Sequence, residues 1–235
     1  MILYIVRHGD PIYDPDSLTP LGLRQAEAVS RRFTAYGLDE IYASTCVRAQ
    51  LTAKPTCEIL GKDMTTYEWM SENFAWEHFS TRNEEQNGWV FIKRRTAMRS
   101  KEMKELGDEW YKHPAFADTD AEAGYRRLCR ESDDFFAKLG YVNDRENGCY
   151  RAINHNDNRV AVFCHGGFGA SWLGAILNLP LPVTWSTFCF GLTGVFVIQF
   201  SPDQNGLVVP EVVTANNEAH LILENLPGLH TERRY

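Results

Sequence analysis

The stretch Ile2-Leu3-Tyr4-Ile5-Val6-Arg7-His8-Gly9 joins an apolar run directly to an arginine, a histidine and a glycine. An apolar run that ends in this way is typical of a fully buried strand. At the carboxyl end of a strand in an open α/β sheet, side chains project into the crevice where ligands bind. We therefore expect Arg7 and His8 to lie in a binding crevice.

A second stretch repeats this arrangement late in the chain. The apolar run Val160-Ala161-Val162-Phe163-Cys164 is followed by His165-Gly166-Gly167. Two parallel strands at the centre of one sheet bring their carboxyl ends to the same edge. The two stretches therefore predict that the imidazoles of His8 and His165 face each other.

The order of the remaining patterns predicts the fold class. Thr19 and Pro20 are expected to start a helix that ends at Gly37. Further patterns predict strands over 40–43, 65–69 and 195–200, a helix from Ser44 that Pro55 kinks or restarts, and a helix over 168–177. An Asn-Gly turn at 205–206 returns the chain through 207–213, and the tail from Ala215 is expected to be exposed. This alternation predicts a three-layer α/β/α sandwich with a mostly parallel sheet and an antiparallel edge.

The segment 71–158 breaks the alternation. It shows no convincing strand pattern, although connections between elements usually have only about 2–6 residues. Helical patterns cover 88–110 and 121–139, and the polar run 144–158 is expected to be a surface loop. We expect one domain over residues 1–235 with an inserted helical lid at about 71–158.

Composition restricts the partners and the location of the protein. The chain has 235 residues, of which 44% are hydrophobic and 23% are charged, as in soluble globular proteins. Its net charge of −7 argues against nucleic acid, and its most apolar window, 168–181, is too short and too rich in glycine for a membrane span. The six cysteines show no C-x-x-C pair and no signal peptide is evident, so we expect free thiols in the cytoplasm.

Four side chains that are or can become cationic are expected to converge: Arg7, His8, Arg48 and His165. A guanidinium offers planar donors that match phosphate oxygens, and the backbone N–H groups of the helix after Gly166 would add to such a cradle. An imidazole in this setting can attack phosphorus, because neighbouring cations lower its pKa. The second imidazole, when charged, would stabilise the transition state. A leaving alkoxide needs a proton, for which Glu72 and Glu77 are the candidate donors.

Four motifs in order resemble the histidine phosphatase (phosphoglycerate mutase-like) superfamily. They are Arg7-His8-Gly9, Thr19-x-x-Gly22-x-x-Gln25-Ala26, Ser44-x-x-x-Arg48-Ala49-x-x-Thr52-Ala53 and His165-Gly166-Gly167. The resemblance implies that His8 is phosphorylated, that Arg7, Arg48 and His165 hold the phosphate, and that no metal or organic cofactor takes part. It also places the proton donor at Glu72, in Met70-Ser71-Glu72, with Glu77 as the second candidate.

The chain departs from the pattern of the family at several positions. Asp14 stands where many members carry asparagine, and an acidic loop over 10–14 suits a phosphate site only if it binds a substrate group or points away. Ala75 and His78 stand where glycines are common. The Trp-Asn that follows Arg-His-Gly in the mutases is absent, which favours a phosphatase over a mutase.

Three functions agree with these residues. The first is a metal-independent phosphatase acting on a small phosphomonoester, the second a phosphoglycerate-type mutase, and the third a phosphate-binding member with little catalysis. The sequence leaves the phosphoester and the oligomeric state open. Cys164 lacks an arginine six positions later, which excludes the tyrosine-phosphatase pattern, and the remaining histidines lack zinc spacing.

Two further groups of residues have alternative interpretations. Lys93-Arg94-Arg95 and Arg99 form either a solvated helix face or a contact to a second phosphate. A set of aromatic residues packs the core and the lid, or in part lines a pocket for an apolar leaving group. This set is Trp69, Phe74, Trp76, Phe79 and Trp89.

Overall fold

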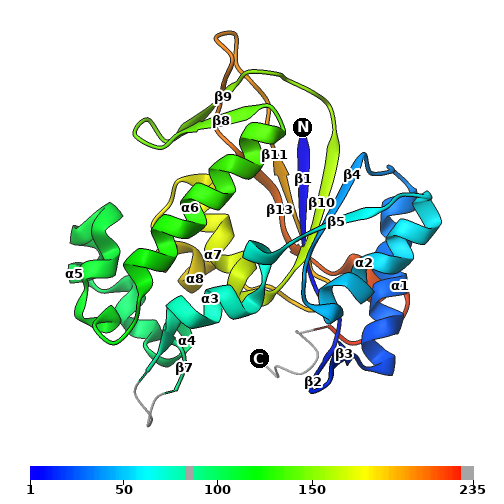
Figure 1. The fold of residues 1–235 in the computed structure, drawn as a ribbon, viewed down its shortest axis with the longest axis horizontal. Coiled ribbons are helices and arrows are strands. Elements are labelled where there is room, and N and C mark those ends of the chain that lie inside the picture. The colour runs from blue at the N-terminus through cyan, green and yellow to red at the C-terminus, as the bar shows by residue number, and fades with distance from the viewer. Residues whose placement is uncertain (83–86, 229–235) are drawn as a thin grey trace.

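A twisted central sheet organises the computed structural model, which describes residues 1–82 and 87–228 (Figure 1). The order of its strands is β13-β11-β1-β10-β4-β5. Their bounds are β1 Ile2–Arg7, β4 Glu40–Ser44, β5 Met64–Tyr67, β10 Arg159–Cys164, β11 Val195–Gln199 and β13 Glu211–Asn217. The strands β1, β10, β4 and β5 run parallel, whereas β11 and β13 form an antiparallel edge. The predicted mostly parallel sheet is confirmed.

The two strands that end in histidine are direct neighbours. In the register of β1 and β10, Arg7 lies opposite Cys164, and the N–H of His8 donates to the carbonyl of Cys164 at 2.9 Å. The residues that follow this last pair are His8 and His165. The sheet therefore presents both imidazoles at one edge.

Helices cover both faces of the sheet. Alternate residues of β1 point to opposite faces, and both sets of side chains are apolar and buried under helices. Tyr4 and Val6 pack with α1 and α2, whereas Leu3 and Ile5 join the larger core under α6 and α7. The helix bounds are α1 Pro20–Thr34, α2 Val47–Leu60, α3 Glu72–Phe79, α6 Ala121–Lys138, α7 Gly166–Leu177, α8 Leu181–Thr187 and α9 Ala219–Leu223. The three layers visible in Figure 1 are those expected of an α/β/α sandwich.

Helix α1 is tied to the end of β1 by a close backbone contact. The hydroxyl of Thr19 accepts a hydrogen bond from the N–H of Gly22 at 3.0 Å, as the capping pattern predicts. A Cβ at Gly9 would lie 2.6 Å from the carbonyl oxygen of Gly22, so only glycine fits there. This contact fixes the chain immediately after His8. Helix α2 begins after Cys46, later than predicted, and continues through Pro55 as one helix.

The expected helix over 88–110 is wrong, because this segment consists of short pieces. They are β7 Gly88–Trp89, α4 Val90–Lys93, the 3₁₀ helix η3 Arg95–Arg99, α5 Lys101–Leu106 and the 3₁₀ helix η4 Gly107–Lys112. Arg94 leaves the helical conformation, Ser100 caps α5 through the N–H of Met103, and Gly107 has a φ of +53°. These local breaks interrupt an apolar periodicity that is otherwise helical. The helix expected over 121–139 is α6, and the 3₁₀ helices η1 Glu68–Met70 and η5 Pro114–Phe116 are also present.

The segment 71–158 also contains strands, contrary to the prediction. They are β6 Ser80–Thr81, which pairs with β7, and the hairpin β8 Tyr141–Asp144 and β9 Cys149–Ala152. The predicted surface loop 144–158 therefore contains the strand β9 and the last residue of β8, and the rest of it is turn, bend or irregular. These strands are short, and Tyr141 and Tyr150 hold the hairpin by packing against Phe200, far away in the sequence. Tertiary packing of this kind leaves no strand pattern in the sequence.

The C-terminal part differs from the expected simple hairpin. The strand β12, Leu207–Val208, pairs with β9, and only β13 returns along β11. The small strands β2 Pro11–Tyr13 and β3 Asp16–Leu18 form a separate hairpin after β1. The predicted exposed tail contains the end of β13 and α9, and its last part, 229–235, lies outside the described residues. Across 1–82 and 87–228, no helix is long and apolar enough to cross a membrane.

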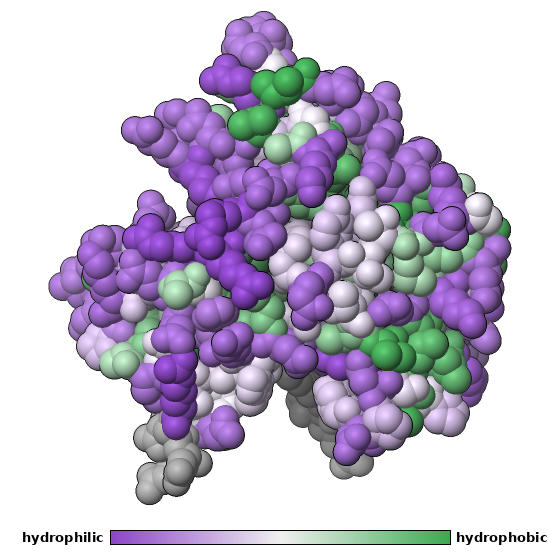
Figure 2. Space-filling model, in the orientation of Figure 1, coloured by the Kyte–Doolittle hydropathy of each residue, from purple (hydrophilic) through white to green (hydrophobic). Residues whose placement is uncertain are grey.

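Figure 2 shows mostly hydrophilic residues on the face of the molecule seen in Figure 1. The same view shows a hollow between the part that carries β7 and α4 and the part that carries β2 and β3. Residues from both parts line a cavity with a volume of about 670 Å³. The carboxyl edge of the central sheet opens into this cavity.

Candidate active site

His8 lies at the bottom of the cavity with 2% of its surface exposed. Its Nδ1 lies 2.7 Å from the carbonyl oxygen of Gly9. A carbonyl only accepts hydrogen bonds, so Nδ1 carries the proton and Nε2 of the neutral ring has a free lone pair. Burial, followed by the charges of Arg7 and Arg48, lowers the pKa of His8 to about 3. The ring is therefore neutral at physiological pH, as a nucleophile requires.

His165 stands beside His8, with 5.2 Å between the ring centroids and an angle of 61° between the ring planes. Its Nε2 lies 2.8 Å from the hydroxyl of Ser44, which also accepts from the N–H of Cys46 at 3.1 Å. The Ser44 hydroxyl is thus placed to donate its own proton to Nε2, which leaves a proton on Nδ1. Burial and the neighbouring His8 hold the pKa of His165 well below its usual value. A neutral His165 with a proton on Nδ1 donates a hydrogen bond without the positive charge that we expected.

Arg7 and Arg48 bring permanent positive charge to the two rings. Nη1 of Arg7 donates to the carbonyl of Phe190 at 2.6 Å, and Arg48 is 7% exposed. Within the part of the chain that the structure describes, Nε of each arginine and Nδ1 of His165 are buried without a hydrogen-bond partner. Buried donors of this kind usually have a partner, and an anion at the end of the cavity lined by Arg7, His8 and Arg48 is a suitable one.

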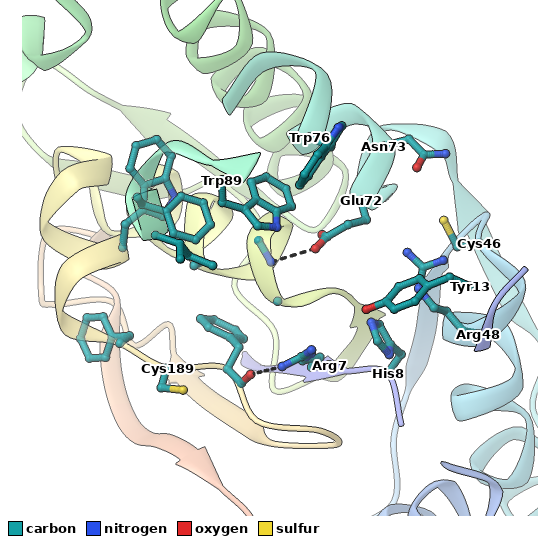
Figure 3. A pocket seen from close by; sticks show the side chains of 18 of the residues that line it. Arg7, His8, Tyr13, Cys46, Arg48, Glu72, Asn73, Trp76, Trp89 and Cys189 are labelled. Carbon is teal, nitrogen blue, oxygen red and sulfur yellow. Dashed lines mark hydrogen bonds between the residues drawn. The ribbon is translucent and has the colours of Figure 1, made fainter. Parts of the chain in front are cut away.

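Glu72 is the first residue of α3, after the cap formed by Ser71. Its Oε1 accepts from the N–H of Gly167 at 3.1 Å and its Oε2 from the N–H of Phe168 at 3.0 Å. Desolvation of the carboxyl raises the pKa of Glu72 and outweighs these two bonds and the charges of the arginines. Figure 3 shows Glu72 between the tryptophans Trp76 and Trp89 and the group formed by Arg7, His8 and Arg48.

Two other predicted positions differ from expectation. Gly166 lines the cavity, but the next two N–H groups of α7 bind Glu72, whereas we expected them to face a phosphate. A Cβ at Gly166 would lie 3.3 Å from Nε of Arg7, so the glycine lets the guanidinium approach the start of α7. Of the two candidate donors, Glu77 is exposed on α3 and does not line the cavity, whereas Glu72 does.

Two other motif residues, Thr52 and Gln25, form hydrogen bonds that position the segments carrying the site. The hydroxyl of Thr52 donates to the carbonyl of Arg48 and accepts from the N–H of Gly9 at 3.0 Å, which links α2 to the end of β1. Gln25 accepts from the N–H of Asp10 and donates to the carbonyl of Pro227. These contacts give each polar motif residue a positioning task.

Asp16 is a site residue that the sequence did not reveal. Its Oδ1 accepts from Nη1 of Arg48 at 2.8 Å, and its Oδ2 accepts from the N–H of Val47 at 2.7 Å. The suspected acidic residues lie elsewhere: Asp10 accepts from the hydroxyl of Thr19, and Asp14 is exposed outside the cavity lining. Only the pairing of β2 with β3 brings Asp16 to Arg48, and no local pattern signals it.

The substitution Asp16→Asn is expected to tighten the binding of inorganic phosphate. The carboxylate competes with a dianion for Arg48 and repels it, so its removal should lower the Kd by roughly three- to tenfold. Isothermal titration calorimetry measures the change, with Asp14→Asn as a control in the same hairpin. Weaker binding by Asp16→Asn would mean that the carboxylate chiefly orients Arg48.

The basic run and the aromatic residues divide between structure and cavity. Arg95 lines the cavity and donates to the carbonyl of Ser186, whereas Arg94 pairs with Asp118 and Arg99 donates to the hydroxyl of Thr187. Of the predicted aromatic residues, Trp69, Phe74 and Phe79 are buried in the core, and Trp76 and Trp89 line the cavity. Five further aromatic residues, which no local sequence pattern marks, also line the cavity: Tyr13, Phe91, Trp185, Phe188 and Phe190.

The described residues contain no group of three or more His, Cys, Asp or Glu side chains that could hold a metal ion. The donors and charges at this site come from arginine and histidine, from the hydroxyl of Ser44 and from the carboxyl groups of Glu72 and Asp16. This set suits the binding of a phosphoryl group and the transfer of protons.

Comparisons with known proteins agree with this geometry. Residues 3–212 match the family model of the histidine phosphatase superfamily, branch 1. Among solved structures, the phosphoserine phosphatase of Entamoeba histolytica in complex with 3-phosphoglyceric acid is similar, with a TM-score of 0.60 and 18% identity over 94% of this chain and 98% of that chain.

A mycobacterial glucosyl-3-phosphoglycerate phosphatase with inorganic phosphate has a TM-score of 0.60 and 19% identity, over 93% of this chain and 98% of that chain. No match to this chain is found among curated proteins. The family match and these phosphatase neighbours support the classification of the protein as a phosphoric monoester hydrolase. With the motifs, the fold and the paired imidazoles in agreement, the chain belongs to the histidine phosphatase superfamily.

Proposed function

We propose that the protein is a metal-independent phosphatase that hydrolyses a small phosphomonoester through a phosphohistidine at His8. The observation that carries this proposal is the pair of buried rings, 5.2 Å apart, between Arg7 and Arg48. The structural neighbours named above are phosphatases of phosphoserine and of glucosyl-3-phosphoglycerate, which also supports a phosphomonoester as the substrate.

In the first step, the lone pair on Nε2 of His8 attacks phosphorus and the bond from phosphorus to the leaving oxygen breaks. The protonated carboxyl of Glu72 gives its proton to that oxygen, which leaves as an alcohol. The guanidinium groups of Arg7 and Arg48 and the Nδ1 proton of His165 stabilise the charge on the other phosphoryl oxygens.

In the second step, a water molecule gives a proton to the carboxylate of Glu72 and attacks the phosphohistidine. The bond from nitrogen to phosphorus breaks, inorganic phosphate leaves, and Glu72 is protonated again. Protons and charge therefore balance over the cycle with His8 and Glu72 as the reacting groups.

We also propose that the segment 71–158 closes the site within a single domain. Its described part supplies Glu72 and the cavity-lining side chains of Trp76, Trp89 and Phe91. Its contribution to the lining suggests that this insertion determines which ester fits. With six free cysteines and a net charge of −7, we place the protein in the cytoplasm, without nucleic acid or membrane partners.

The fate of the phosphoryl group tests the proposed function. With a panel of phosphorylated metabolites, we expect ³¹P NMR to show inorganic phosphate as the product. An isomerised phosphoester would instead identify a mutase. Tight binding of phosphate without any turnover would identify a phosphate-binding protein.

A further inference from the structure

The cavity is much larger than a phosphoryl group needs. Its volume of about 670 Å³ lies in the range of pockets that hold drug-sized ligands, about 300–1,000 Å³. Arg7, His8 and Arg48 provide the lining at one end, and much of the remaining lining is aromatic. The rest of the substrate therefore meets several aromatic rings, together with polar side chains such as Asn73, Arg95 and Thr187.

Two tryptophans flank the group that protonates the leaving oxygen. Trp76 follows Glu72 by four residues on α3, so the two side chains lie on the same face of the helix. The indole of Trp89 covers Gly167, whose N–H binds Glu72, because a Cβ at Gly167 would lie 2.6 Å from that ring. Figure 3 shows Glu72 beside both indoles, so a leaving group whose oxygen is next to Glu72 lies beside them too.

Trp76, Trp89, Phe91 and Trp185 form a continuous aromatic wall whose rings are packed in place before a ligand binds. The rings of Trp76 and Trp89 meet edge to face at 5.0 Å, and Trp89 stacks on Phe91 at 5.2 Å. Phe91 in turn stacks on the buried ring of Trp185 at 5.2 Å. A chain of packed rings leaves little freedom for the wall, so a flat ligand binds without ordering it first.

Packing in the core accounts for the positions of Phe91 and Trp185, but not for the exposed ring of Trp76. Phe91 and Trp185 are buried, whereas Trp76, which also lines the cavity, is 41% exposed. The hydrophobic effect favours covering such a surface, and edge-to-face or stacked contacts with another ring add to the gain. A small polar leaving group would leave this surface in water.

We propose that the leaving group of the substrate is a flat aromatic ring system, which binds against Trp76 and Trp89 while Glu72 protonates its oxygen. This inference rests on the proposed phosphatase function and narrows its substrate class. Phe190 lines the cavity too; its carbonyl binds Arg7 and its ring stacks on Phe196 at 4.1 Å. The aromatic lining and the phosphate end are therefore joined in one rigid site.

Three phosphate esters of primary alcohols test the inference: glycerol 1-phosphate, benzyl phosphate and 2-naphthylmethyl phosphate. Their leaving alcohols have similar acidity, so differences in kcat/KM report binding rather than leaving-group chemistry. We expect kcat/KM to rise along this series, by about 100-fold from the glycerol to the naphthylmethyl ester. Equal kcat/KM values for the three esters would overturn the inference.

Variants of Trp76 show whether the preference arises at this wall. The ratio of kcat/KM for the naphthylmethyl ester to that for the glycerol ester should fall about tenfold in Trp76→Ala and be largely restored in Trp76→Phe. Tyr36→Ala is the matched control, because Tyr36 is 64% exposed and does not line the cavity. An unchanged ratio in Trp76→Ala would contradict the inference.

The failures of the two proposals are distinguishable. Rapid hydrolysis of all three esters without preference would support the phosphatase function and contradict the proposal of an aromatic leaving group. If none of the esters or of the phosphorylated metabolites releases phosphate, the phosphatase itself is wrong, and the inference fails with it.

Discussion

Replacement of His8 by alanine is expected to lower kcat for an aryl phosphate by a factor of about 10⁴ or more. The variant lacks the nucleophile, and the arginines and His165 alone can only bind the ester. Among residues 1–82 and 87–228, the imidazole of His8 bonds to the adjacent Gly9, so its loss leaves the sheet and the helix caps intact. Release of inorganic phosphate measures the rate.

The control for this experiment is His155→Ala. His155 is a surface histidine outside the cavity, with 44% of its side chain exposed, and its removal should leave turnover unchanged. Circular dichroism and thermal unfolding must show that both variants fold. Turnover by a folded His8→Ala at the rate of the wild type would end the proposal of a phosphohistidine.

Replacement of Glu72 by glutamine is expected to lower kcat for alkyl phosphates by about 10²- to 10⁴-fold. An alkoxide is a poor leaving group unless it is protonated, and the side-chain amide of the glutamine is not acidic enough to protonate it. The loss should be much smaller for 4-nitrophenyl phosphate, because its leaving group is stable as an anion. Glu77→Gln, on the exposed side of the same helix, is the matched control. Equal losses for both esters would mean that Glu72 acts in some way other than proton donation.

The pH profile follows from the same two groups. His8, with its pKa lowered to about 3, is neutral at all higher pH values, so it limits the rate only in strong acid. Glu72 has a raised pKa and stays protonated further toward neutral pH, and the rate should fall as the pH rises through that value. This basic limb should disappear in Glu72→Gln. A rate that increases from acidic to alkaline pH would contradict the paired roles.

The features that the sequence predicted are local ones. Buried strands that end in Arg7-His8 and in His165 are recognisable because an apolar run and its last polar residues are adjacent in the chain. The same holds for the cap at Thr19 and for Arg48 at the start of α2. Parallel strands end at the same carboxyl edge of a sheet. These local patterns were therefore enough to predict that both imidazoles and both arginines lie close together.

The features that the sequence missed depend on contacts between distant segments. Asp16 reaches Arg48 only through the β2–β3 hairpin. The hairpin of β8 and β9 is held by Phe200, and the aromatic wall joins Trp89 on β7 to Trp185 on α8 through Phe91. In the segment 88–110 the helical periodicity was real, but the backbone breaks at Arg94 and Gly107 turned it into short pieces. Such arrangements have no signature within a short stretch of sequence.

A crystal structure of the protein with orthovanadate tests the central claim most directly. The account predicts vanadium bonded to Nε2 of His8, with its equatorial oxygens contacted by Arg7, Arg48 and Nδ1 of His165. Glu72 should lie at the oxygen opposite His8. Vanadate bound elsewhere in the cavity, or bonded to a different side chain, would contradict the account.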